Sequence, residues 1–259
     1  MCKIKVPKLI ESFFYEKKKL IPFKLRLYLK IGLRYLVDIK TGQLAEFVSN
    51  KPMIEAEKSR FIPQITISQL LKISPRSVNK KHNLSLAIKA IENVIIEPGK
   101  IFSFWHLVGN PHAQKGYLEG RSIVADQIKE EYGGGLCQLS GLIHFLALKA
   151  GLNMLERYPH SQDLYTEETR FAPLGSDATV VYGYKDLRFR NTLSVPICLR
   201  FIIDDDQVTG TLCIPDSLTE LTVDFRQKPA ENGSFVETIR YIDNRSEVEL
   251  LYATFYKKI

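Results

Sequence analysis

The stretch YGGGLCQLSGLIHFLALKAG, residues 132–151, decides the fold, because it joins a triple-glycine turn to the clearest helical pattern in the chain. After Cys137, apolar residues recur at the i, i+3, i+4 spacing of one helix face, and Gly151 is well placed to end the helix. The three glycines raise a question. They either shape a turn that presents a reactive thiol, or only let a loop pack closely around a small buried residue.

From residue 152 onward the pattern changes from helical to strand-like, with β-branched and aromatic runs between turn signals. The candidate strands are 152–158, 178–184, 187–191, 196–203, 207–214, 221–225, 236–242 and 247–256. In one hairpin, a two-residue turn at Asp205-Asp206 would bring Cys198 opposite Cys213. The order of elements predicts an α+β fold: a helical N-terminal part, then a Cys-bearing helix packed on a mostly antiparallel β-sheet.

Upstream of the glycines, the sequence favours helices. Residues 22–37 alternate apolar and basic side chains, but their leucines, lysines and arginines favour a helix over a strand. Residues 83–95 carry a helical stripe with Asn83 as a plausible N-cap, and residues 109–120 are interpreted as a loop. We therefore divide the chain into a basic, mainly helical region, 1–82, and an α+β domain, 83–259.

Charge and composition narrow the function classes. Residues 1–51 contain twelve lysines and arginines against four acids, whereas the whole chain has a net charge of +7. This segment is either a solvated basic face or a peripheral contact with an anionic membrane. We expect no specific nucleic-acid partner, because no such binding motif is present. Without a signal-like or membrane-spanning run, we expect a cytoplasmic location, and the motifs predict no cofactor or metal.

Cys137 is the candidate nucleophile, because the unpaired N–H groups of a helix N-terminus favour a thiolate over a thiol. Gly133, Gly134 and Gly135 would let the backbone approach a substrate closely. The N–H of Cys137 or of Gln138 could hold an oxyanion. This order of glycine turn, cysteine and helix is similar to the layout of papain-like and transglutaminase-like enzymes.

A cysteine nucleophile needs a base, and the base needs an orienting group. His144 lies seven residues along the same helix, about 10 Å from Cys137, too far for a hydrogen bond. His160 follows a predicted strand that could return past the helix, so it is the candidate base. Asp177 is the candidate acid, Asp186 is the second choice, and Asp163 is the third.

Four sequence blocks together resemble the VanW family, which is named for an accessory protein of B-type vancomycin resistance. The blocks are EPGKIFSFWHLVGNPHAQKGYLEG, GGGLCQLS, ERYPHSQDL and GSDATVVYGYKDLRFRN, within residues 83–213. Cys137 and His160 match family positions. Some members have glycine where Asp177 stands, which leaves Asp186, or a dyad without an acid, open. The resemblance implies a bacterial protein linked by name to glycopeptide resistance, and supplies no reaction.

The leading hypothesis is a Cys-His-Asp enzyme that transfers acyl groups or hydrolyses amides of a small-molecule, peptide or cell-wall-related substrate. Trp105, Tyr117 and Arg121 could line its binding cleft with Gln138 and the glycines. The alternative is a non-catalytic binding module, in which the glycine turn and helix N-terminus hold an anionic or peptide ligand and Cys137 is incidental.

Overall fold

The computed structural model describes residues 22–51, 53–72, 75–124, 127–163, 170–242 and 247–258. The chain divides into two compact units, residues 1–45 and residues 46–259. Within the first unit, α2 (Phe23–Lys40) confirms the helix predicted over 22–37. No helix among the described residues is long and apolar enough to cross a membrane. The membrane contact expected for residues 1–51 stays a prediction.

The remaining elements follow in chain order. The helices are α3 (Gln43–Glu46), α4 (Glu55–Lys58), α5 (Ser77–Ile91), α6 (Phe104–Val108), the 3₁₀ turn η1 (Ala113–Lys115) and α7 (Leu136–Lys149). The strands are β1 (Ile62–Leu70), β2 (Ile101–Ser103), β3 (Glu119–Val124), β4 (Gln127–Tyr132), β5 (Asn153–Glu156), β6 (Gln162–Asp163), β7 (Arg188–Arg190), β8 (Cys198–Ile203), β9 (Gln207–Ile214), β10 (Val223–Ala230), β11 (Gly233–Ile242) and β12 (Glu247–Lys258).

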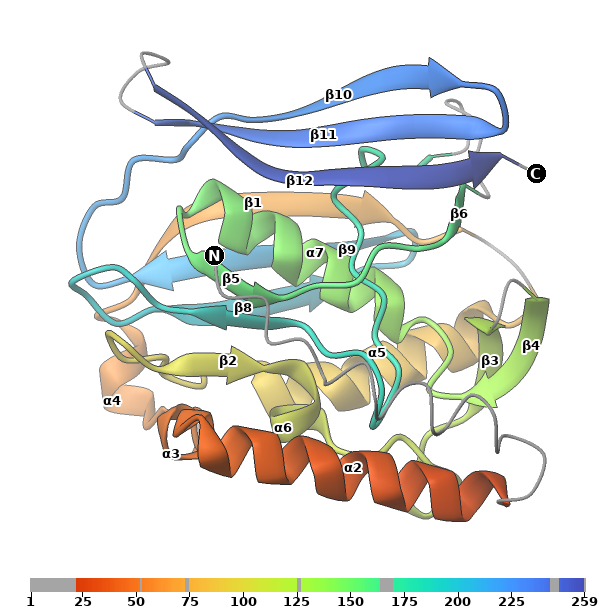
Figure 1. Ribbon diagram of the computed structural model, residues 1–259. Coiled ribbons are helices and arrows are strands. Elements are labelled where there is room, and N and C mark those ends of the chain that lie inside the picture. Colours follow the sequence, from red (N-terminus) through yellow and green to blue (C-terminus); the bar gives the residue numbers. More distant parts are fainter. Residues whose placement is uncertain are drawn as a thin grey trace. The chain divides into compact units, whose positions relative to one another are not determined.

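These strands form small sheets around α7. Their orders are β1-β9-β8, β10-β11-β12-β6 and β2-β7-β5, with β3-β4 as a separate hairpin, and every pairing except β12–β6 is antiparallel. Figure 1 shows α7 between the β1-β9-β8 sheet and the C-terminal strands β10–β12. The predicted α+β class and the Cys-bearing helix on an antiparallel sheet are thereby confirmed. The closer likeness to papain or transglutaminase stays a prediction.

The core forms on the apolar face of α7. Leu139, Leu142 and Leu146 are fully buried, and each contributes about 1.5–3 kcal/mol through burial. Gly210 of β9 lets the helix approach, since a Cβ there would lie 3.0 Å from Leu142 Cδ2. On the opposite side of α7, the ring of Phe145 packs edge-on against Phe225 of β10, with 5.5 Å between centroids. The helix is therefore held between two layers of strands.

The β8–β9 hairpin has the register predicted from the sequence. Ile203 faces Val208, and Cys198 faces Cys213. Both cysteines are buried and both are free thiols. The register follows from matching apolar residues on one face of the hairpin, because a slip by one residue would turn all of them to the other face.

Four features differ from the sequence interpretation. The strand predicted over 178–184 is not formed, because Gly183 (φ +75°) reverses the chain and Val181 bridges to Lys185 instead. β1 lies in the region predicted as mainly helical, where it is a strand whose backbone bonds are completed by antiparallel pairing with β9. β3 begins inside the predicted loop 109–120. Asn83 lies inside α5 rather than at its N-cap, and its buried amide bonds Leu118 and the Gly134 carbonyl. The predicted domain boundary after residue 82 stays a prediction, although the β1–β9 pairing crosses it.

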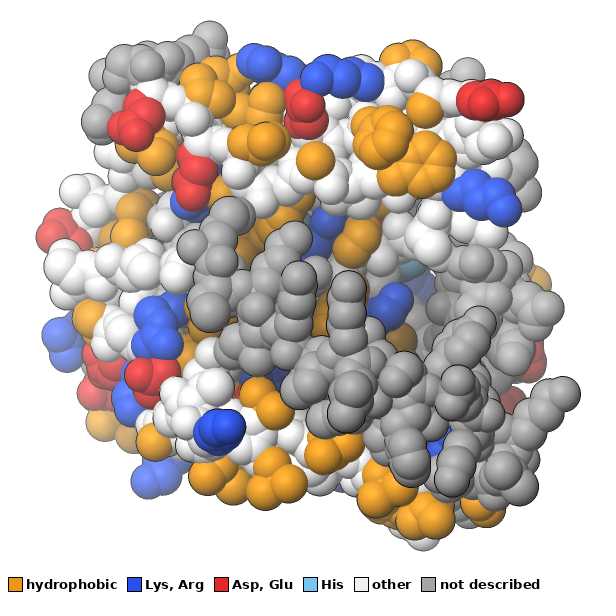
Figure 2. Space-filling view, in the orientation of Figure 1, with side chains coloured by type: hydrophobic (Ala, Val, Ile, Leu, Met, Phe, Trp, Pro, Cys, Tyr) orange, Lys and Arg blue, Asp and Glu red, His pale blue; other side chains and the backbone are white. Residues whose placement is uncertain are grey.

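The C-terminal sheet carries apolar side chains on its surface, visible over β10–β12 in Figure 2. Phe235, Val248, Leu250 and Phe255 are exposed, and the rings of Phe235 and Phe255 lie 5.0 Å apart. These two phenylalanines face each other across β11 and β12. Cross-strand aromatic pairs of this kind stabilise antiparallel strands.

Candidate active site

The triple-glycine turn has a backbone reason for each glycine. Gly133 (φ +83°) and Gly135 (φ +102°) adopt left-handed conformations that other residues rarely take. Gly134 lies against the backbone of Gly120, where a Cβ would stand 2.3 Å from the Gly120 carbonyl carbon. The turn therefore connects β4 to α7 through close backbone packing. This packing accounts for the glycines without a ligand, and their predicted binding role stays a prediction.

Gly134→Ala is expected to lower the free energy of unfolding by about 1–3 kcal/mol, because the methyl group has no space against Gly120. Gly141→Ala, inside α7, is the matched control. Its Cβ would make only ordinary contacts of 3.6 Å or more, so stability should hold or rise by up to about 1 kcal/mol. Denaturant titration of both variants measures the difference, and equal stabilities would contradict the close-packing explanation.

At the start of α7, some backbone N–H groups donate hydrogen bonds to carbonyls of the glycine turn and others do not. The N–H of Leu136 donates to Gly133 O, and that of Gln138 donates to Gly135 O at 2.9 Å. The Gln138 side chain donates to Leu70 O at the end of β1. Of the two N–H groups predicted for an oxyanion, that of Gln138 is therefore already engaged. The N–H of Cys137 donates to no backbone carbonyl of the described residues.

The structure brings Cys137, His160 and Asp177 together. The Nδ1 atom of His160 lies 2.8 Å from Asp177 Oδ2, and the same oxygen accepts from the His160 backbone N–H at 2.6 Å. The His160 side chain also interacts with the Cys137 thiol. The thiol is half-buried and directed toward Val180 O, at 3.6 Å. This arrangement has the order of thiol, imidazole and carboxylate found in nucleophilic enzymes.

The charges of the three groups support one another. Burial alone would raise the pKa of Cys137, but hydrogen bonding to His160 and the charge of His160 outweigh it and lower the pKa below its ordinary value. Burial would likewise lower the pKa of His160, yet Asp177 and then Cys137 raise it to about 10. The arrangement therefore favours a thiolate beside an imidazolium at neutral pH.

Asp177 is held by two residues that the sequence analysis did not select. Arg157 Nη2 and the Tyr256 hydroxyl both donate to Asp177 Oδ1, at 2.8 Å and 2.5 Å. Arg157 comes from the segment after β5, and Tyr256 comes from β12. Burial would raise the pKa of Asp177, but His160 and Arg157 hold it well below its usual range. A carboxylate with these donors stays ionised and fixes the orientation of the imidazole.

The other candidates have structural partners. Asp186 is buried and accepts from Ser103 Oγ, at 2.6 Å, and from Arg188 Nε. The Asp163 carboxylate accepts two hydrogen bonds from the Arg170 guanidinium in a bidentate ion pair. Burial lowers the pKa of His144 to about 3, and its Nδ1 lies 2.7 Å from Ser176 O. His144 is therefore a neutral core residue.

The predicted cleft residues are distributed unevenly. Trp105 is half-buried, and its indole N–H donates to Lys185 O at 2.7 Å. Lys185 closes the backbone turn that follows Val180, whose O faces the thiol at 3.6 Å, so Trp105 is bonded to the segment beside Cys137. Tyr117 is buried in the core, and burial raises its pKa to about 12. Arg121 belongs to β3, and its side chain lies outside the described part of the chain.

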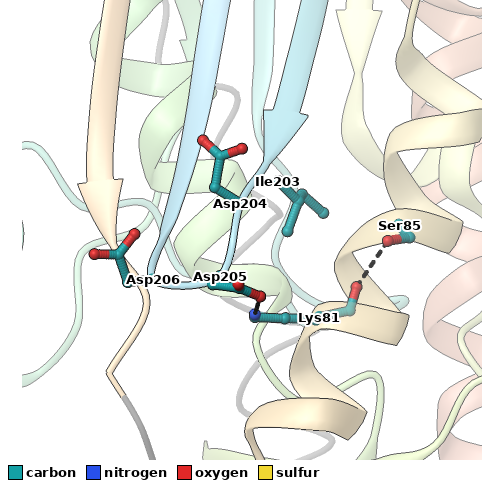
Figure 3. A pocket seen from close by; sticks show the side chains of 6 residues that line it. All are labelled: Lys81, Ser85, Ile203, Asp204, Asp205 and Asp206. Carbon is teal, nitrogen blue, oxygen red and sulfur yellow. Dashed lines mark hydrogen bonds and ion pairs between the residues drawn. The ribbon is translucent and has the colours of Figure 1, made fainter.

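A surface hollow elsewhere contains none of the three grouped residues. It lies between α5 and the β8–β9 turn and is lined by Lys81, Ser85, Ile203 and Asp204–Asp206 (Figure 3). Lys81 Nζ is 3.3 Å from Asp205 Oδ1, and Ser85 Oγ donates to Lys81 O. These contacts join the hairpin turn to α5, and we assign the hollow no functional role.

Comparisons with known proteins agree with the family resemblance. A family model described as VanW like protein matches residues 79–213, which include Cys137, His160 and Asp177. The chain is 32% identical over 191 residues to a Bacillus subtilis protein named Uncharacterized protein YoaR, covering 73% of this chain and 54% of that protein. It is 30% identical over 162 residues to the Vancomycin B-type resistance protein VanW of Enterococcus faecalis, covering 61% and 59%. The chain thus spans little more than half the length of these relatives, and no solved structure matches it.

Proposed function

The chain belongs to the VanW-like family, and from that premise we propose that it is a cysteine-dependent enzyme that transfers acyl groups or hydrolyses amides. One observation carries the proposal. The His160 side chain interacts with the Cys137 thiol. On its other side, the His160 Nδ1 atom lies 2.8 Å from the ionised carboxylate of Asp177. An imidazole placed between a thiol and a carboxylate is the arrangement that activates a cysteine nucleophile.

In the proposed reaction, the Cys137 thiolate attacks the carbonyl carbon of an amide and a C–S bond forms. The His160 imidazolium gives its proton to the nitrogen of the leaving amine as the C–N bond breaks. Water, or a second amine, then attacks the thioester, and His160 accepts the proton of that nucleophile. The C–S bond breaks and the thiolate–imidazolium pair is restored. Asp177 keeps the imidazole oriented and stabilises its positive charge throughout.

The backbone N–H of Cys137 is the proposed oxyanion donor. It belongs to the first turn of α7, where the helix dipole adds positive potential, and it donates to no carbonyl of the described backbone. The N–H of Gln138 is left out of this role because it donates to Gly135 O at 2.9 Å. The glycine turn contributes by setting the start of the helix.

We place the substrate among amides and peptides, with cell-wall-related peptides as the first group to examine. The name of the enterococcal relative, a vancomycin B-type resistance protein, motivates this choice. The reaction needs no cofactor or metal, because the three side chains supply nucleophile, base and orienting charge. A cytoplasmic site of action remains an expectation.

Acylation by p-nitrophenyl acetate tests the proposal without knowledge of the substrate. We expect a burst of about one p-nitrophenolate per chain, followed by slower turnover, with an acetyl thioester on Cys137 detected by mass spectrometry of peptides. Cys137→Ala should abolish the burst, because Cys198 and Cys213 are fully buried. Cys2→Ser, which changes a residue outside the described part, is the matched control and should keep the burst.

Two results would overturn the proposed function. One is the absence of a Cys137 thioester in protein that unfolds cooperatively. The other is an acetyl group spread over lysines with the same rate in Cys137→Ala. In either case the glycine turn and thiol would be structural, and a non-catalytic role would replace the enzyme.

A further inference from the structure

A tight turn, residues 181–185, lies directly beside the thiol. Val180 O is the carbonyl that faces Cys137 Sγ at 3.6 Å. The next residue, Val181, exchanges two backbone hydrogen bonds with Lys185, each 2.9 Å. Gly183 allows the reversal through a left-handed conformation, φ +75°. The position of Lys185 relative to Cys137 is therefore fixed by a short, closed backbone loop.

Further bonds anchor the end of this turn. The indole N–H of Trp105 donates to Lys185 O at 2.7 Å. The next residue, Asp186, is buried and accepts from the Trp105 backbone N–H at 3.1 Å. Trp105 also packs edge-on against Tyr182, with 5.6 Å between ring centroids. The turn is thus attached to α6 by main-chain and side-chain contacts.

The Lys185 side chain places a positive charge near the reacting groups. Its Nζ lies 5.7 Å from the centroid of the Tyr158 ring, two residues before His160 in the chain. Its charge is one of the influences that lower the pKa of Cys137. No carboxylate among the residues that the structure describes forms an ion pair with it. The Lys185 ammonium therefore has no counter-ion within the described part of the chain, while its backbone is held in the closed turn.

We propose that Lys185 binds a carboxylate of the substrate, next to the carbonyl that Cys137 attacks. The inference rests on the proposed function and adds the substrate class: an acyl compound or peptide with a carboxylate close to the bond that breaks. A half-buried ammonium over an aromatic ring attracts a neighbouring anion more strongly than an ammonium in bulk water does, because its surroundings screen the charge less. Lys185 is accordingly a specificity-determining residue, with Trp105 and Tyr182 beside it.

Alkylation by a matched pair of reagents tests this proposal. Iodoacetate carries a carboxylate next to the reacting carbon, and iodoacetamide has the same shape without the charge. We expect Lys185→Met to lower the iodoacetate-to-iodoacetamide rate ratio at Cys137 by about 3- to 10-fold at low salt. Lys185→Glu should lower it by about 10-fold or more, and added NaCl should reduce both differences. Methionine preserves an apolar stem over Tyr158.

Lys89→Met, on the exposed side of α5, is the matched control and should leave the ratio unchanged. An unchanged ratio in both Lys185 variants, with iodoacetamide still labelling Cys137, would overturn the carboxylate site and leave the enzyme proposal intact. Failure of iodoacetamide to label native Cys137 in any variant would instead remove the reactive thiol, and both proposals with it.

Discussion

Replacing Arg157 with methionine is expected to lower the free energy of unfolding by about 3–5 kcal/mol, because it breaks a buried ion pair and removes one partner only. The Arg157 side chain is 2% exposed. Its guanidinium donates to Asp177 at both the carboxylate and the main-chain oxygen, and to Gly175 O, Thr254 Oγ1 and Tyr256 OH. Methionine fills most of the volume but leaves these acceptors without their donor.

Denaturant titration monitored by fluorescence measures this loss conveniently, since Trp105 is the single tryptophan of the chain. Arg226→Met is the matched control. Arg226 also pairs with an aspartate and a tyrosine, Asp224 and Tyr241, but its side chain is 51% exposed. Its loss should cost far less stability than the loss of Arg157, because solvent screens an exposed ion pair. Equal losses in the two variants would show that Arg157 has no special place in the fold.

Part of the site can be predicted from the sequence and part cannot, and the difference lies in whether a residue's signals are local. Cys137 can be predicted as the candidate nucleophile because its signals are local: a glycine turn before it and a helical pattern after it. His160 and Asp177 begin or end predicted segments, where side chains can reach a neighbour. Asp177 and Asp186 looked alike in sequence, and only their partners, His160 in one case and Ser103 with Arg188 in the other, distinguish them.

The supporting contacts depend on residues far apart in the chain, which a local pattern cannot reveal. Tyr256 contacts Asp177 across 79 positions, from a strand outside the matched family region. Gly134 needs to be glycine because of Gly120, on the paired strand β3. The strand β1 is hard to predict for the same reason, since its partner β9 lies more than a hundred residues later. The helix α7 was predictable because a helix satisfies its own backbone.

His160→Ala is expected to slow the alkylation of Cys137 by iodoacetamide about 10-fold or more at pH 6. Without the imidazolium, the thiol pKa rises toward about 8.5, so less than about 1% is thiolate at pH 6, although each thiolate becomes a better nucleophile. In the unchanged protein the imidazolium persists up to its pKa of about 10. The rate of Cys137 alkylation in the unchanged protein should therefore vary little between pH 6 and 9. In His160→Ala the rate should rise nearly tenfold per pH unit up to pH 8.

Asp177→Asn should fall between these two curves. The amide removes the largest favourable influence on the imidazolium and so lowers the pKa of His160, yet the ring remains beside Cys137. Stopped alkylation followed by mass spectrometry gives the rate at each pH, with Cys2 as the internal reference. His82→Ala, which removes an exposed histidine bonded to Gly116 O, is the matched control and should leave the profile flat. A flat profile in His160→Ala as well would mean that the helix N-terminus alone ionises Cys137, and the imidazole would lose its assigned role.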